Sequence, residues 1–125
     1  SVPLIGNGDV RDYIDGVNRM DNLDGFMIGR AAIGNPWCFQ NRRKYPSPTN
    51  FQRIEIALEH FHLFRSFRKE IVAVKEFRKY LGSYVNGFRN AKEWRNKLMQ
   101  CQDEISFVRC MKEIQQLEPP LALAG

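Results

Sequence analysis

The chain has 125 residues, of which 43% are hydrophobic and 26% charged, and a formal net charge of +5. This length suits one ordinary domain and excludes a complete (β/α)8 barrel, which needs roughly 250 residues. The composition excludes a disordered tail, and charged residues interrupt every apolar run before it reaches the roughly 18 residues of a membrane span. We therefore expect a soluble globular chain with no membrane partner.

The first 45 residues are typical of a strand–helix–strand unit. The apolar run Val2–Ile5 ends abruptly at Gly6-Asn7-Gly8-Asp9, which predicts a buried strand followed by a tight loop. We expect Asp9 to cap a helix that ends near Asp21, with Asp12 in its first turn. A second apolar run, Phe26–Ile28, again breaks at glycine. The order of these elements predicts a βαβ unit.

Both glycine loops have the character of a phosphate site. A loop between a strand and a helix presents converging backbone N–H groups, and glycines leave room for a ligand to approach them. The first loop holds Gly6 and Gly8, and the second holds Gly29 and Arg30, whose guanidinium can pair with phosphate oxygens. Residues 31–33 could add a short helix. Two ordinary turns with structural glycines remain the alternative.

The sequence changes character after residues 46–50, where two prolines predict a linker. Apolar residues then recur at helical spacing and predict four helices joined by short loops, hence an antiparallel bundle. Thr49 with Gln52, and Asn90 with Glu93, resemble N-terminal capping boxes. The first helix carries one stripe with Ile54, Ala57 and Phe61. A second stripe with Ile56, Leu63 and Phe67 predicts that this helix is covered on two faces.

The last three helices are expected from about Glu70 to Asn86, from Asn90 past Leu98, and from about Ile105 to Leu117. Pro119-Pro120 would end the last one.

The positive charge is concentrated in the middle of the chain. Residues 50–100 contain eleven Lys and Arg against five Asp and Glu, whereas residues 1–49 contain six against five and residues 101–125 two against four. Helical spacing places several of these cations on one face of two consecutive helices and in the loop between them, namely Lys75, Arg78, Lys79, Arg89, Lys92 and Arg95. The nearby acidic residues are Glu76 and Glu93. This pattern favours a polyanionic partner, and a solvated helical face is the alternative.

Cysteine and histidine suggest no catalytic or metal site. Cys38, Cys101 and Cys110 form neither an even set nor a CxxC pair, so a disulfide framework and a zinc site are not expected, and a reducing cytoplasm fits the chain. We expect Cys38 to be a buried structural thiol. His60 and His62 stand two residues apart, on different faces of a helix, and make a poor metal pair.

The segments Ile5–Asp9, Asp24–Arg30 and Gly34-Asn35-Pro36-Trp37 strongly resemble the C-terminal part of the tRNA-dihydrouridine synthases. Phe77–Tyr84 is similar to an Arg-Lys-His/Tyr…Tyr element of the helical tRNA-binding domain of that family. The resemblance covers nearly the whole chain, up to about Leu117, and the segments follow the family's order and spacing.

The resemblance implies a fold and a function. The fold would be an α/β fragment holding the last two strands of a (β/α)8 TIM barrel (residues 1–45), followed by a linker (46–50), a mainly α four-helix bundle (51–118) and a tail (119–125). The function would be that of a flavoprotein oxidoreductase that uses FMN and NADPH to reduce uridine in tRNA. The catalytic cysteine of the family would lie in a preceding barrel portion, and we expect this fragment alone to be inactive.

The resemblance also assigns binding residues. Asn7, Gly8 and Asp9 would form one side of the FMN phosphate and ribityl site, with Gly29 and Arg30 on the other. We expect Asp9 to offer its backbone amide, because its carboxylate would repel a phosphate. The six cations of the bundle would contact tRNA. A non-catalytic RNA-binding helical module and another FMN-dependent TIM-barrel oxidoreductase remain the alternative functions.

Overall fold

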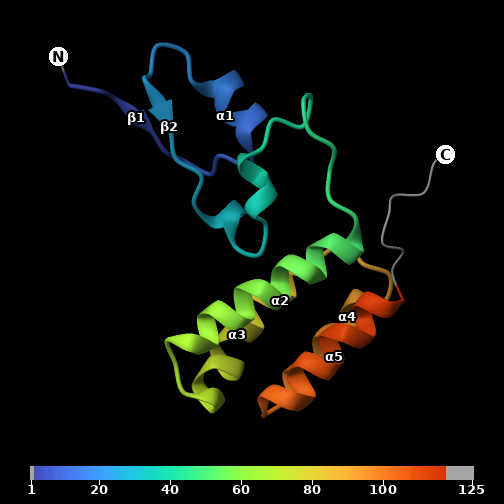
Figure 1. Cartoon of the computed structure of the whole chain (residues 1–125). Helices are drawn as coiled ribbons and strands as arrows, with labels where there is room; N and C mark the ends of the chain where they lie inside the picture. Colours follow the sequence, from blue (N-terminus) through green and yellow to red (C-terminus); the bar gives the residue numbers. More distant parts are fainter. Residues whose placement is uncertain (1, 118–125) are drawn as a thin grey trace. The chain divides into compact units, whose positions relative to one another are not determined.

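The computed structural model describes residues 2–117, which form two compact units divided between Ser47 and Pro48 (Figure 1). The first contains β1 (Ile5–Gly6), α1 (Tyr13–Arg19), β2 (Gly25–Phe26) and the 3-10 helices η1 (Arg30–Ala32) and η2 (Pro36–Phe39). The second contains α2 (Asn50–Ser66), α3 (Glu70–Tyr84), α4 (Ala91–Gln100) and α5 (Glu104–Gln116). The predicted fold class is confirmed as two parallel strands followed by a mainly helical region, which is consistent with the end of a barrel plus a helical domain.

β1 and β2 pair in parallel, with Ile5 opposite Gly25 and Gly6 opposite Phe26. Both strands are shorter than the sequence predicts, and they are displaced from the runs Val2–Ile5 and Phe26–Ile28. The reason is that each strand has only the other as a hydrogen-bonding neighbour among the residues described. Flanking apolar residues are accordingly exposed, with Val2 at 82% and Met27 at 55%.

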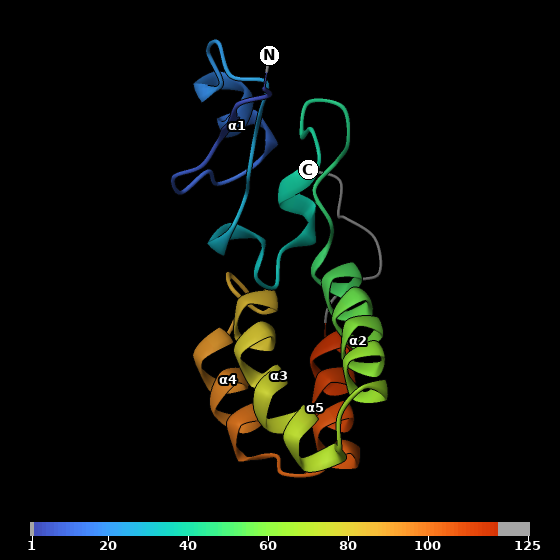
Figure 2. The same ribbon diagram turned by 90° about the vertical axis from the view of Figure 1, so that its left-hand side faces the viewer.

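α2 to α5 lie side by side as a bundle (Figure 2), in which α2 packs against α3 and α5, and α4 packs against α3 and α5. Aromatic rings fill the centre. The Phe61 ring lies 5.3 Å from that of Phe77 and 5.0 Å from that of Phe107, and all three side chains are fully buried. Such edge-to-face and tilted ring pairs add to the free energy of apolar burial.

Of the two capping boxes predicted at helix starts, one is present and one is not. Thr49 accepts a hydrogen bond from the Gln52 amide at 3.1 Å, and Gln52 accepts one from the Thr49 amide at 2.9 Å, which confirms the capping box. The box predicted at Asn90 is wrong, because the left-handed backbone of Asn90 (φ 61°) leaves its side chain without a capping hydrogen bond.

The second stripe predicted on α2 is also wrong. Leu63 is 62% exposed and Phe67 is 77% exposed, because the helices that pack against α2 cover the face holding Ile54, Ala57 and Phe61 instead. Helix α5 ends at Gln116. The expected stop at Pro119-Pro120 and the predicted tail 119–125 lie outside the described residues.

Phe77 and Phe67 provide a matched test of this packing. We expect Phe77→Ala to lower the free energy of unfolding by ~3–5 kcal/mol, because it opens a cavity among buried rings. Phe67→Ala should change it by less than ~0.5 kcal/mol, since that ring is largely in water. Urea denaturation followed by circular dichroism measures both values, and equal losses would contradict the aromatic core described here.

Candidate functional site

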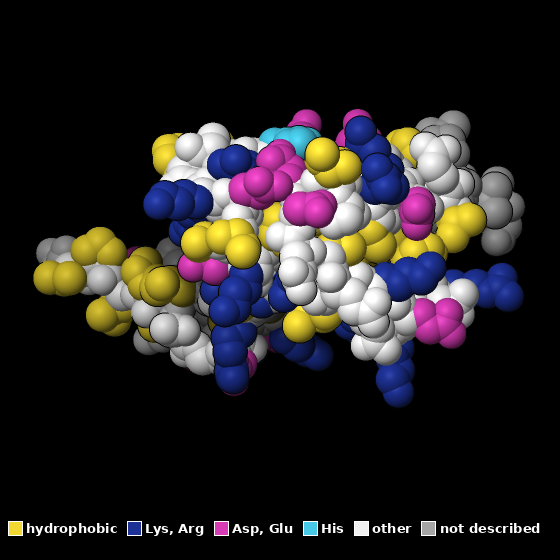
Figure 3. Space-filling view, turned by 90° about the horizontal axis from the view of Figure 1, so that it is seen from below, with side chains coloured by type: hydrophobic (Ala, Val, Ile, Leu, Met, Phe, Trp, Pro, Cys, Tyr) yellow, Lys and Arg dark blue, Asp and Glu magenta, His cyan; other side chains and the backbone are white. Residues whose placement is uncertain are grey.

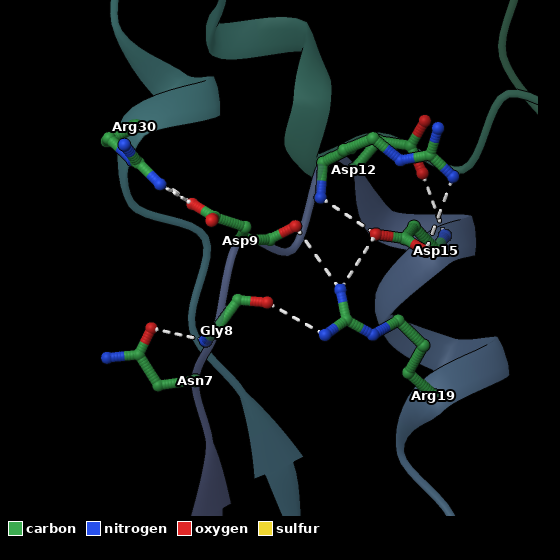
Figure 4. A network of polar contacts seen from close by, with 8 residues as sticks. Asn7, Gly8, Asp9, Asp12, Asp15, Arg19 and Arg30 are labelled. Atoms are coloured by element: carbon green, nitrogen blue, oxygen red, sulfur yellow. Dashed lines mark hydrogen bonds and ion pairs between the residues drawn. The ribbon is translucent and has the colours of Figure 1, made fainter.

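The first glycine loop has an unusual backbone that glycine makes possible. Gly8 has φ 132°, which side-chain-bearing residues rarely adopt, and the next residue, Asp9, is left-handed with φ 50°. The side-chain oxygen of Asn7 accepts a hydrogen bond from the Gly8 amide at 2.7 Å. Figure 4 shows this loop lying between Arg30 and Arg19. The loop therefore has a defined shape that is held from both sides.

Arg19, at the end of α1, holds the loop through its carbonyl groups. Its guanidinium donates to the Gly8 oxygen at 2.7 Å and to the Asp9 oxygen at 3.2 Å, and it also contacts the Asp15 carboxylate at 3.4 Å (Figure 4). In a trans peptide the N–H points opposite to the C=O. The amides of Asp9 and Val10 therefore point away from Arg19, and neither donates to another atom within residues 2–117.

Sequence reasoning missed this role of Arg19. The available signal was its i,i+4 spacing from Asp15, whose carboxylate also accepts a hydrogen bond from the Arg11 amide at 2.9 Å. These contacts lower the pKa of Asp15, with the backbone hydrogen bond from Arg11 as the largest cause. Asp15 stays ionised and helps to fix the arginine in place.

The helix cap expected at Asp9 is found at Asp12 instead. The Asp12 carboxylate accepts a hydrogen bond from the Asp15 amide at 2.8 Å, so α1 begins one turn later than predicted. The Asp9 carboxylate pairs with the Arg30 guanidinium, which donates to it through Nε at 3.0 Å and through a second nitrogen. This ion pair raises the pKa of Arg30 through the hydrogen bond first and the charge of Asp9 second. Asp9 thus joins the two loops.

The second loop adds further amides beside this pair. η1 begins directly at Arg30, and the first amides of a helix have no partner inside it. At Gly29 a side chain would meet nothing within 4 Å, so the space over the backbone is open. The two loops thus contain unbonded amides, an open glycine and an arginine that is paired with Asp9, and backbone amides and arginine are donors of the kind that bind phosphate. The residues assigned from sequence, Asn7 to Asp9 with Gly29 and Arg30, are therefore brought together.

The six predicted RNA-binding cations divide into two groups. Lys75, Lys79, Arg89 and Lys92 are exposed on α3, on α4 and in the loop between them. Glu76, which the sequence offered as a neutralising partner, pairs with Arg68 at 2.9 Å. None of these four cations forms an ion pair with an acidic side chain within residues 2–117.

Arg78 and Arg95 are partly buried and tie α3 to α4. The Arg78 guanidinium donates to the Cys101 carbonyl at the end of α4, and Arg95 Nε donates to the Gly82 carbonyl of α3 at 3.1 Å. Arg95 also donates to the side-chain oxygen of Asn86 at 3.2 Å. A cation is favourable at the carbonyl end of a helix. Each arginine therefore joins the two helices through a backbone carbonyl.

Cys38, Cys110 and His60 lie fully or partly inside the protein. Cys38 is fully buried, as expected, and burial raises the pKa of its thiol. Burial, with Cys101 nearby, raises the pKa of Cys110 to about 11. The His60 ring is within hydrogen-bonding distance of the Tyr84 hydroxyl, at 3.0 Å, and burial lowers the pKa of His60.

Metal-binding clusters and membrane helices are not found in the described part. No group of three or more His, Cys, Asp or Glu side chains in residues 2–117 could hold a metal ion. No helix in the same range is both long enough and apolar enough to cross a membrane.

Comparison with known proteins identifies relatives over most of the chain. The family model for dihydrouridine synthase matches residues 1–118. A probable tRNA-dihydrouridine synthase of Rhizobium leguminosarum bv. phaseoli is 38% identical, over 73% of this chain and 29% of its own length. One of Rickettsia bellii is 29% identical over 84% of this chain and 35% of its own length. The tRNA-dihydrouridine synthase B of Pseudomonas putida is 30% identical over 82% and 33%. The chain spans about a third of the length of these relatives.

The partly buried imidazole of His60 predicts a pH dependence of stability. The folded state lowers the pKa of His60, so the unfolded state binds the proton more tightly. The free energy of unfolding should therefore decrease as the pH falls below about 6.5, and this decrease should end once the pH is below the pKa of His60 in the folded state. Replacing His60 by Gln should remove this part of the slope in thermal unfolding between pH 7 and 5. His62→Gln, at an exposed site on the same helix, should leave it unchanged, and equal effects of both would contradict the assignment.

Proposed function

Because the chain belongs to the dihydrouridine synthase family, we propose that it is the C-terminal part of a tRNA-dihydrouridine synthase. The complete enzyme would use FMN and NADPH to reduce uridine to 5,6-dihydrouridine in tRNA, in the cytoplasm. This chain would contribute the two loops that hold the FMN phosphate and a helical surface for tRNA. The observation that carries the proposal is the family match over residues 1–118 together with two glycine loops at adjacent parallel strands.

The FMN part of the proposal depends on the amides that the loops leave open. The Asp9 and Val10 amides, which point away from Arg19, and the first amides of η1 would donate to the phosphate, with Arg30 beside them. Asn7 orders the loop through its hydrogen bond to the Gly8 amide. Bound FMN would supply the hydride for the reduction.

Exposed apolar side chains at the start of the first unit suggest that another part of the enzyme covers them. Val2, Leu4 and Ile5 are more than half exposed although their sequence is that of a buried strand. We propose that the N-terminal barrel portion of the same enzyme covers them and supplies the catalytic residues. Cys38 does not suit the role of the family's catalytic cysteine, since its thiol is enclosed within the first unit.

The tRNA part of the proposal rests on the charge of α3 and α4. Lys75 and Lys79 lie one turn apart and are exposed, and Arg89 and Lys92 continue the positive surface. Phosphate contacts of this kind provide sequence-independent affinity for nucleic acid. A non-catalytic RNA-binding module is a second candidate, because the bundle has its own aromatic core and forms a unit by itself.

The phosphate loops can be tested by comparing FMN with riboflavin, which lacks the phosphate. We expect the chain to bind FMN more tightly than riboflavin, measured by flavin fluorescence. Arg30→Ala should weaken FMN binding by about tenfold, because it removes a cation beside the phosphate and leaves the Asp9 carboxylate to repel it, and should leave riboflavin binding unchanged. Arg43→Ala removes an exposed arginine that lies after η2, outside both loops, and is the control. A chain that binds tRNA without preferring FMN would favour the module instead.

The tRNA surface can be tested through the salt dependence of binding. Replacing Lys75 and Lys79 together by Ala should weaken tRNA binding and reduce the slope of log K against log salt by roughly two, since about one unit is lost per phosphate contact. Arg109 and Lys112, also exposed but on α5, provide the control double variant, which should keep the original slope. An unchanged slope for the first variant would place the RNA elsewhere on the protein.

A further inference from the structure

Two hollows of the bundle differ in charge. The larger, of about 580 Å³, runs along α5, where Glu104 and Glu113 stand beside Arg109 and Lys112. Figure 3 shows mixed side chains of this kind, with magenta, dark blue and yellow surfaces around a cyan histidine. Because its charges oppose one another, this groove has no preference for a polyanion.

The smaller hollow, of about 190 Å³, lies between α3 and α4 and has a different character. Its lining is Arg78, Lys79, Gly82, Arg95, Leu98 and Met99, with three cations and no acidic residue. Leu98 and Met99 give it an apolar wall, and Gly82 adds no side chain. The hollow is smaller than the roughly 300–1,000 Å³ of a site for a whole small molecule. It suits one unit of a larger ligand that is also held elsewhere.

The two arginines of this hollow are held in place before any ligand arrives. Arg95 is bonded to the Gly82 carbonyl and the Asn86 side chain, and Arg78 to the Cys101 carbonyl. Neither is paired with a carboxylate in residues 2–117, and the buried Nε of Arg78 has no hydrogen-bond acceptor there. The positive charge around the hollow is therefore fixed in position and not neutralised.

We propose that this hollow between α3 and α4 receives one unpaired nucleotide of the bound RNA. The base would lie against Met99 and the fixed guanidinium groups, because unpaired bases stack on arginine planes and apolar side chains. The adjoining phosphate would pair with Lys79, which is exposed at the rim. This inference rests on the proposed tRNA function and adds to it a site that reads an unstacked base rather than the backbone alone.

The first test places the same new charge inside and outside the hollow. Met99 and Gln100 are neighbours in the last turn of α4, both exposed, but only Met99 lines the hollow. Met99→Glu should weaken tRNA binding by about tenfold, because it blocks the base and neutralises the cations. Gln100→Glu changes the net charge equally and should cost less than threefold. Circular dichroism spectra of both variants, compared with that of the parent chain, would check that they fold.

Equal losses in these two variants would overturn the nucleotide site and leave the tRNA surface standing. A chain that binds no tRNA at all would overturn both proposals. A second measurement does not depend on affinity: a photoreactive benzophenone side chain at position 99 should crosslink to one unpaired nucleotide of the tRNA, mapped by primer extension. The same group at position 105, in the larger groove, is the control. Crosslinks from position 99 only to base-paired nucleotides would also overturn the site.

Discussion

The parallel pairing of β1 with β2 is the constraint on which the candidate phosphate site depends. Ile5 lies opposite Gly25 and Gly6 opposite Phe26, and the Met27 amide continues the ladder by donating to the Gly6 oxygen at 2.8 Å. Parallel strands in register end at the same edge of a sheet, so the two glycine loops leave it together. Residues 21 positions apart in the chain, Asp9 and Arg30, can then form an ion pair.

The bundle holds several positively charged side chains close together on a stable helical frame. The buried rings of Phe61, Phe77 and Phe107 keep the helices packed, so cations on the outer face do not have to be neutralised for the unit to stay folded. Arg78 and Arg95 add direct ties between α3 and α4 through backbone carbonyls. Packing inside and carbonyl dipoles between the helices together compensate for repulsion at the surface.

Contacts made within one helical turn could be predicted from the sequence. Contacts between elements that are distant in the chain could not. The Thr49–Gln52 box formed because both its hydrogen bonds are made within one turn. Asn90 is also a residue type that favours the N-cap position, but its backbone is left-handed, which sequence spacing does not reveal. Exposure of Leu63 depends on which helices reach α2, and the contact of Asp9 with Arg30 depends on strand pairing. The sequence proposes site residues by their type, whereas the contacts of these residues required the fold.

The Asp9–Arg30 pair bears on how the two proposed anionic ligands, a flavin phosphate and a tRNA, would be kept apart. An arginine that already faces a carboxylate attracts passing anions weakly, so the glycine loops present little net charge to a long polyanion. A small phosphate that fits between the open amides can still gain hydrogen bonds there. The excess of positive charge lies instead in residues 50–100, on the other unit. If both proposals hold, electrostatic attraction would direct the macromolecule to the helices, and shape would direct the small molecule to the loops.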